Sequence, residues 1–89
     1  MANPTTVSCT QNTWVKVATN VKTGMIHKRT KKRSTYLQTY RLTGEAAPTN
    51  RNEGIEAFSK CGSISIGSDV EIDVYIMCLG TTGSVRVDV

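Results

Sequence analysis

The residues with the most distinctive chemistry form one basic run in the first half of the chain. His27-Lys-Arg-Thr-Lys-Lys-Arg33 carries five full positive charges in seven positions, on Lys28, Arg29, Lys31, Lys32 and Arg33. Clustered Lys and Arg side chains bind phosphate groups, and each contact adds to a salt-dependent affinity. The same run could instead pair with acidic residues of a protein partner, or remain a solvated tip between two strands. The residues alone leave all three interpretations open.

Catalytic chemistry has few candidates in this sequence. His27 is the only histidine, and no acidic residue lies near it in the chain to orient the imidazole. Glu71 and Asp73 share one face of a strand-like stretch that also contains Asp69, and could bind a hard cation only weakly, so we expect a solvated sheet face. No P-loop, dinucleotide fingerprint or HExxH motif is present. We therefore expect no enzymatic activity, no catalytic residue, no metal and no cofactor.

Three cysteines, Cys9, Cys61 and Cys78, are an odd number without CxxC spacing. This predicts buried free thiols rather than a disulfide framework or a zinc site. Residues 1–6 lack the charged and apolar regions of a secretory signal, and the longest apolar run, residues 74–79, is six residues long. We expect neither export nor a membrane span, and no membrane as a partner.

Recurring β-branched stretches separated by turn residues predict an all-β fold. We expect one domain over residues 1–89, a small β-sandwich or β-barrel of about seven or eight short, mainly antiparallel strands. The expected strands cover residues 6–9, 13–19, 24–28, 34–43, 55–60, 63–66, 70–78 and 84–89. Residues 1–5 are predicted to form an extended arm, residues 28–33 a basic loop and residues 44–54 an irregular loop, in which residues 45–48 could form one helical turn.

The clearest alternation is in Val70-Glu-Ile-Asp-Val-Tyr-Ile-Met-Cys78. It predicts a core face made of Val70, Ile72, Val74, Ile76 and Cys78. The opposite face begins acidic and ends apolar at Tyr75, Met77 and Leu79, so we expect either the fold or a partner to cover that end. These three residues are therefore candidate partner-binding residues.

Alternation also assigns faces to three other segments. In Ser84-Val-Arg-Val-Asp-Val89 the valines are predicted to point inward, and Gly80-Thr-Thr-Gly83 before it is typical of a β-hairpin turn. Tyr36, Tyr40 and Leu42 share one face; burial in the core is favoured, while exposed tyrosines beside the basic run would indicate stacking on nucleic-acid bases. Trp14 is predicted to be partly buried.

Charge is divided unevenly along the chain. Residues 1–44 contain eight Lys and Arg residues and no acid, whereas residues 45–89 contain seven acids and three basic residues. This division could direct a basic surface onto nucleic acid, or bring the basic surface of one copy to the acidic surface of the next. Because 89 residues bury a modest core, we also expect the protein to form homo-oligomers.

Three strings, Asn12-Thr-Trp-Val-Lys-Val-Ala-Thr-Asn-Val21, Val74-Tyr-Ile76 and Val85-Arg-Val-Asp-Val89, resemble the small accessory virion proteins of tailed bacteriophages. The resemblance covers the two ends of the chain and does not include residues 28–33. It implies a β-sandwich or β-barrel capsid decoration or cement protein, often a trimer, that binds major capsid protein in the virion and is made in the bacterial cytoplasm. The alternatives are a neck or tail component, and a nucleic-acid-binding β module that uses the basic loop.

Overall fold

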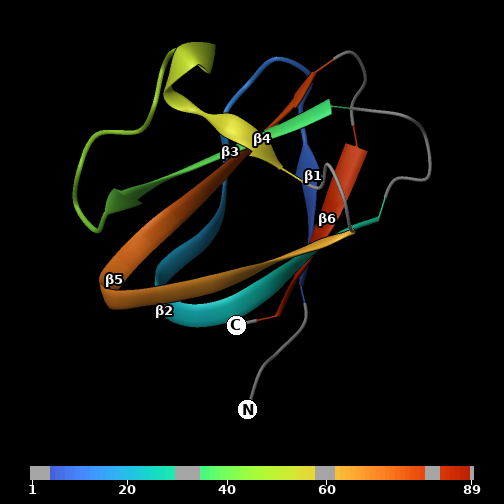
Figure 1. Ribbon diagram of the computed structural model, residues 1–89. Coiled ribbons are helices and arrows are strands. Elements are labelled where there is room, and N and C mark those ends of the chain that lie inside the picture. The colour runs from blue at the N-terminus through green and yellow to red at the C-terminus, as the bar shows by residue number, and fades with distance from the viewer. Residues whose placement is uncertain (1–4, 30–34, 58–61, 80–82, 89) are drawn as a thin grey trace.

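The computed structural model describes residues 5–29, 35–57, 62–79 and 83–88, which form one curled antiparallel sheet (Figure 1). Its strands are β1 (Thr5–Cys9), β2 (Val15–Lys28), β3 (Thr35–Leu42), β4 (Ile55–Ala57), β5 (Ser63–Leu79) and β6 (Gly83–Asp88), with one 3-10 helix, η1 (Arg51–Glu53). The strand order is β1-β6-β2-β5-β3-β4. The all-β, antiparallel prediction is confirmed, but the described residues form six strands instead of seven or eight.

The strand count differs because two pairs of expected strands are each one long, bent strand. β2 joins the expected strands at residues 13–19 and 24–28, and β5 joins those at residues 63–66 and 70–78. The register between β2 and β5 shifts three times between Lys16 and Thr23, where Asn20 has a left-handed φ of 54°. Such irregularities increase strand twist and bending. The first half of β2 pairs with the second half of β5, and the second half of β2 pairs with the first half of β5. The bend between the halves lets the sheet curl over itself (Figure 1).

The expected hairpin between the last two strands is wrong. β6 pairs with β1 and β2, whereas β5 pairs with β2 and β3. The two strands are therefore separated by β2 in the sheet, and residues 80–82 lie outside the described part. Similarly, β5 separates β2 from β3 in the sheet, so the two strands on either side of the basic run do not pair with each other. Between β5 and β6, non-local pairing has overridden the hairpin signal of the sequence.

The inside of the curl holds the core. Ile72, Val74, Ile76 and Cys78 are buried as predicted, together with Val85 and Val87 of β6. Val70 is half exposed, which corrects its assignment to the core. The reason is the bend, because β5 begins to pair with β3 only at Ile72 and Val70 lies before that point. Val89 lies outside the described residues.

The opposite face of β5 is covered by the chain itself. Tyr75 and Met77 are each 4 % exposed. Met77 pairs across the sheet with Leu37, and the Lys16 Nζ lies 5.9 Å from the centre of the Tyr75 ring. Of the two expectations for this end, it is the fold that covers Tyr75 and Met77, so these two residues are not available as partner-binding residues, whereas Leu79 is half-buried.

Trp14, which is partly buried as predicted, fastens the loop over residues 44–54 to the sheet. Its Nε1 donates a hydrogen bond to the Asn50 carbonyl oxygen at 3.2 Å, and its ring lies against Gly54. The loop's one helical turn is η1, capped by Asn50, and not residues 45–48. No helix in the described ranges has the length and apolarity to cross a membrane.

Candidate functional site

A groove of about 430 Å³ opens between the edge of β4 and the N-terminal half of β5. Ile72 and Val74 of β5 contribute buried apolar side chains to it. Further lining residues come from β3, from the segment leading into β4, and from the first half of β5: Gln38, Thr39, Tyr40, Glu53, Ile55, Ser65, Ile66, Gly67 and Ser68. The groove therefore joins parts of the chain that only the curl of the sheet brings together.

Exposed apolar side chains surround this groove. Tyr40 is 66 % exposed, Leu42 52 %, Ile55 68 % and Val70 51 %. We call these four residues the apolar rim. Tyr40 and Ile55 line the groove directly, Leu42 pairs across the sheet with Ile72, and Val70 lies two residues before Ile72 on the same strand. A group of exposed apolar side chains beside a concave apolar surface is typical of a site that contacts another molecule.

The sequence prediction placed Tyr40 and Leu42 in the core, and the structure corrects this. Alternation correctly put Tyr36, Tyr40 and Leu42 on one face, and Tyr36 is fully buried. β4, however, pairs with β3 only as far as Gln38. The rest of β3, which contains Tyr40 and Leu42, has no β4 residue beside it. The length of β4, which the sequence pattern did not reveal, decides which part of this face is covered.

Glu53 is the one charged side chain among the described residues that line the groove. Glu53 accepts backbone hydrogen bonds from Thr49 and Asn50, each at 2.9 Å, and forms an ion pair with Arg41. These backbone hydrogen bonds and the guanidinium lower the pKa of Glu53 below its ordinary value of 4.5. Among the described residues that line the groove there is no Lys or Arg.

Two exposed acids, Asp69 and Glu71, flank Val70 of the apolar rim and bring negative charge beside the groove. Asp73, which was expected on the same solvated face, is instead 3 % exposed. Its carboxylate accepts the Asn20 backbone N–H at 3.0 Å and lies 3.4 Å from the Lys16 Nζ. Asp73 therefore holds the irregular part of β2 and is not available to a ligand.

The structure shows only the start of the predicted basic site. Lys28 ends β2, and its Nζ lies 5.4 Å from the centre of the Tyr36 ring. The Arg29 backbone N–H donates to the Ser84 carbonyl oxygen at 3.1 Å. Lys31, Lys32 and Arg33 lie outside the described residues. Because Tyr36 is fully buried, it cannot stack on a nucleic-acid base, which removes half of the predicted tyrosine platform.

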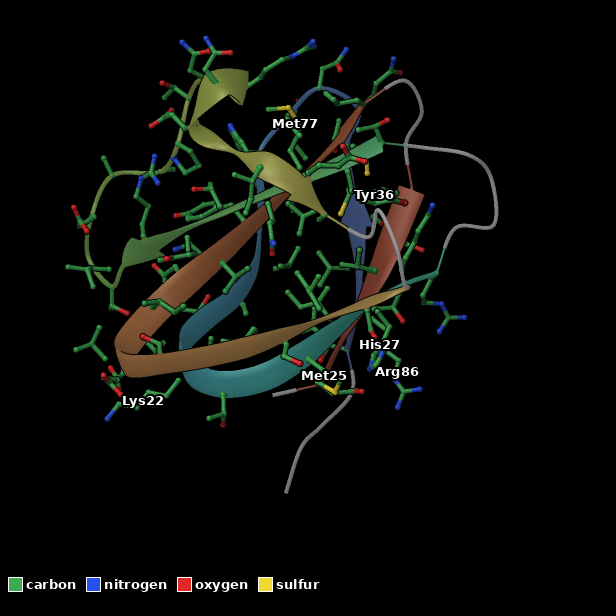
Figure 2. The ribbon with its side chains drawn as sticks, in the orientation of Figure 1. Lys22, Met25, His27, Tyr36, Met77 and Arg86 are labelled. Carbon is green, nitrogen blue, oxygen red and sulfur yellow. The ribbon has the colours of Figure 1, made fainter. Side chains whose placement is uncertain are left out.

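His27 has an acidic partner that sequence proximity did not reveal. Its Nε2 lies 3.1 Å from an Asp88 carboxylate oxygen, and the Arg86 Nε donates to the other oxygen at 3.1 Å. Figure 2 shows His27 and Arg86 close together where β2 and β6 pair. This cluster is a hydrogen-bonded network on a sheet surface. Within the part of the chain that is described, no three His, Cys, Asp or Glu side chains gather to hold a metal ion.

Cys9 and Cys78 are free and buried, as predicted. Burial, reinforced by the neighbouring Cys78 thiol, raises the pKa of Cys9 to about 12. Such a thiol is a poor nucleophile at neutral pH, so Cys9 contributes packing and not reactivity. Cys61 lies outside the described residues.

Comparison of the chain with protein-family models, with curated proteins and with solved structures finds no match. Function is therefore inferred from the groove, the apolar rim and the charges beside them.

Proposed function

We propose that this protein is a structural, non-enzymatic protein that docks onto other proteins, and specifically a virion protein that decorates or cements a capsid. The observation that supports docking is the apolar rim, whose four members are all more than half exposed around one groove. The virion role comes from the sequence resemblance. In this proposal the curled sheet is a partly open β-barrel, and the groove is the opening in its wall.

The size of the apolar rim favours action in many copies. Complete burial of a large apolar side chain contributes about 1.5–3 kcal/mol, so four half-exposed ones contribute roughly 3–6 kcal/mol. Association itself costs about 4–15 kcal/mol. One rim contact alone therefore gives weak binding, whereas a homo-oligomer that engages several major capsid protein subunits at once gains from multivalency.

The direct test is to purify virus particles from infected bacteria that carry this gene and to quantify the chain by mass spectrometry. We expect many copies in each particle. A Leu42→Glu and Val70→Glu double variant should be lost from the particles, because it places charge on the apolar rim. Met25→Glu is the matched control, since Met25 is 39 % exposed on β2 but is not part of the apolar rim (Figure 2). Absence of the wild-type chain from purified particles would contradict the proposal.

The alternative function is binding of nucleic acid through the basic loop. Light scattering with and without a mixed-sequence oligonucleotide, at low and high salt, separates the two functions. A docking protein should form a homo-oligomer whose mass does not change with oligonucleotide. A monomer that gains mass only with oligonucleotide at low salt, and loses this response when Lys31, Lys32 and Arg33 are all changed to Glu, would favour the nucleic-acid function instead.

A further inference from the structure

We infer that the groove is a slot for an extended strand of a partner protein, which pairs through its main chain with the open edge of β5. This inference rests on the proposed docking function and specifies the chemistry of the partner. It depends on three features of the described residues: which backbone groups of β5 face the groove, what the groove wall opposite β5 is made of, and which charges surround it.

The first half of β5 directs unpaired backbone groups away from β2. The Lys28 N–H donates to the Gly62 carbonyl oxygen at 2.7 Å, so these two residues are a hydrogen-bonded pair. Hydrogen-bonded and non-hydrogen-bonded pairs alternate along an antiparallel ladder. The regular register from residue 63 to residue 67 then makes Ser65 and Gly67 non-hydrogen-bonded positions, whose N–H and C=O groups point away from β2.

No described strand occupies the edge to which these groups point. β5 pairs with β3 only from Ile72 to Leu79, and among the described strands β2 alone pairs with it at Ser65 and Gly67. Both residues are exposed and line the groove. A Cβ added to Gly67 would meet no atom within 4 Å, so the face of the strand is also open at this residue. Unpaired strand edges of this kind bind additional strands.

The opposite wall of the groove also ends in a strand edge. β4 pairs only with β3 among the described strands, and Ile55 at its start lines the groove. Tyr40, Ile72 and Val74 supply apolar surface between the two walls. A strand in the slot would therefore place every second side chain on an apolar surface, the pattern of a strand with one buried face.

Charge complementarity specifies the ends of that strand. Glu53 lines the groove but is already paired with Arg41, and no described Lys or Arg lines the groove. The charge that a partner's strand would meet therefore comes from Asp69 and Glu71, which lie exposed beside the apolar rim and outnumber Lys22 on the facing part of β2. The segment that fits carries alternating β-branched residues flanked by Lys or Arg. A second copy of this chain is the competing occupant, and the experiment separates it from a partner's strand.

The experiment uses the synthetic peptide acetyl-Lys-Thr-Val-Thr-Ile-Thr-Val-Lys-amide, titrated into the ¹⁵N-labelled full chain and followed by NMR. We expect the amides of Ser65 and Gly67 to shift and to become protected from hydrogen exchange. The same peptide with Glu at both ends should bind about tenfold more weakly, a difference of about 1.4 kcal/mol. A peptide with proline at the central threonine should bind more weakly as well, because proline lacks the N–H.

Variants of the chain test the geometry. Ser65→Pro removes the N–H that faces the groove, and proline is tolerated at an open strand edge. It should abolish the peptide-induced shifts, whereas Ser65→Ala keeps the N–H and should bind normally. Tyr40→Ser, at a position 66 % exposed, tests the same slot if Ser65→Pro does not fold, and should weaken binding at least fivefold. Thr6→Ala, at an exposed position of β1 that does not line the groove, should bind like the wild-type protein.

Unchanged Ser65 and Gly67 amides at millimolar peptide would overturn the slot. So would protection of these amides that depends on protein concentration without any peptide, since that result assigns the edge to a second copy. A chain that is present in virus particles but does not bind the peptide refutes only the slot. A chain that is absent from the particles refutes the proposed function.

Discussion

Replacing Gly54 by alanine tests how the loop over residues 44–54 is fastened beside the groove. A Cβ at Gly54 would overlap the Trp14 Cη2, lie 2.9 Å from its Cζ2 and lie 3.2 Å from the Leu37 Cβ. Gly54 has a φ of −109°, so alanine meets no backbone strain there and the cost is steric alone. The indole must therefore move, and its hydrogen bond to Asn50 must lengthen or break.

The expected loss of stability can be estimated from two opposing effects. Forcing extra volume into a packed site costs about 1–3 kcal/mol. Loss of glycine's freedom in the unfolded chain offsets about 0.4–1 kcal/mol of this cost. We therefore expect Gly54→Ala to lower the free energy of unfolding by roughly 1–2 kcal/mol. With a urea dependence of about 1 kcal/mol per molar for a small domain, the midpoint should fall by about 1–2 M.

The assay is urea unfolding followed by tryptophan fluorescence, since Trp14 is the only tryptophan. Gly67→Ala is the matched control, because the added Cβ meets no atom within 4 Å, and it should leave the midpoint within about 0.5 M. In a Trp14→Leu background, followed by circular dichroism, Gly54→Ala should lose most of its effect on the midpoint. Equal midpoints for Gly54→Ala and Gly67→Ala, with unchanged native fluorescence, would refute the packing of Trp14 against Gly54.

Three further predictions concern buried or paired groups. Asp73→Ala should lower the free energy of unfolding by about 2–4 kcal/mol, because it removes a buried hydrogen-bond acceptor and leaves Lys16 without its carboxylate partner. The measurement is urea unfolding, and a loss below about 0.5 kcal/mol would contradict the role assigned to Asp73. The pKa of Glu53 is lowered in the folded state, so its stabilisation is present above the ordinary value of 4.5 and lost as the pH falls through the lower, folded value. Glu53→Gln should therefore differ from the wild-type chain near pH 7 and converge with it in acid-unfolding measurements, and a constant difference at all pH values would count against this. In a Cys61→Ser chain, where the pKa of Cys9 is about 12, a thiol-disulfide reagent at pH 8 should react only after urea is added; rapid reaction of the folded protein would show that Cys9 is accessible.

Much of the fold could be predicted from the sequence where the pattern is local. Alternation in residues 72–78 and 85–87 assigned the inward side chains correctly, because successive residues of any strand point to opposite faces. The free, buried state of Cys9 and Cys78 also followed from their spacing. The basic run was visible as well, but its last three charged residues lie outside the described part and stay a prediction.

The candidate site was not visible in the sequence. Tyr40, Leu42 and Val70 carry the same alternation as their buried neighbours, and nothing local distinguishes them. They are exposed because β4 ends early and β5 bends before it reaches β3. The partnership of His27 with Asp88 was hidden for the same reason, since 61 residues separate them and only the pairing of β2 with β6 brings them together.

The sequence by itself determined which side chains share a face, because that depends only on the two-residue period of an extended backbone. The tertiary structure alone decided which parts of each face are covered, because coverage depends on how far each strand extends and where it bends. Those features result from pairing energies summed over residues distant in the chain. The open edge at Ser65 and Gly67, and the groove beside it, are therefore features that only the tertiary structure decided.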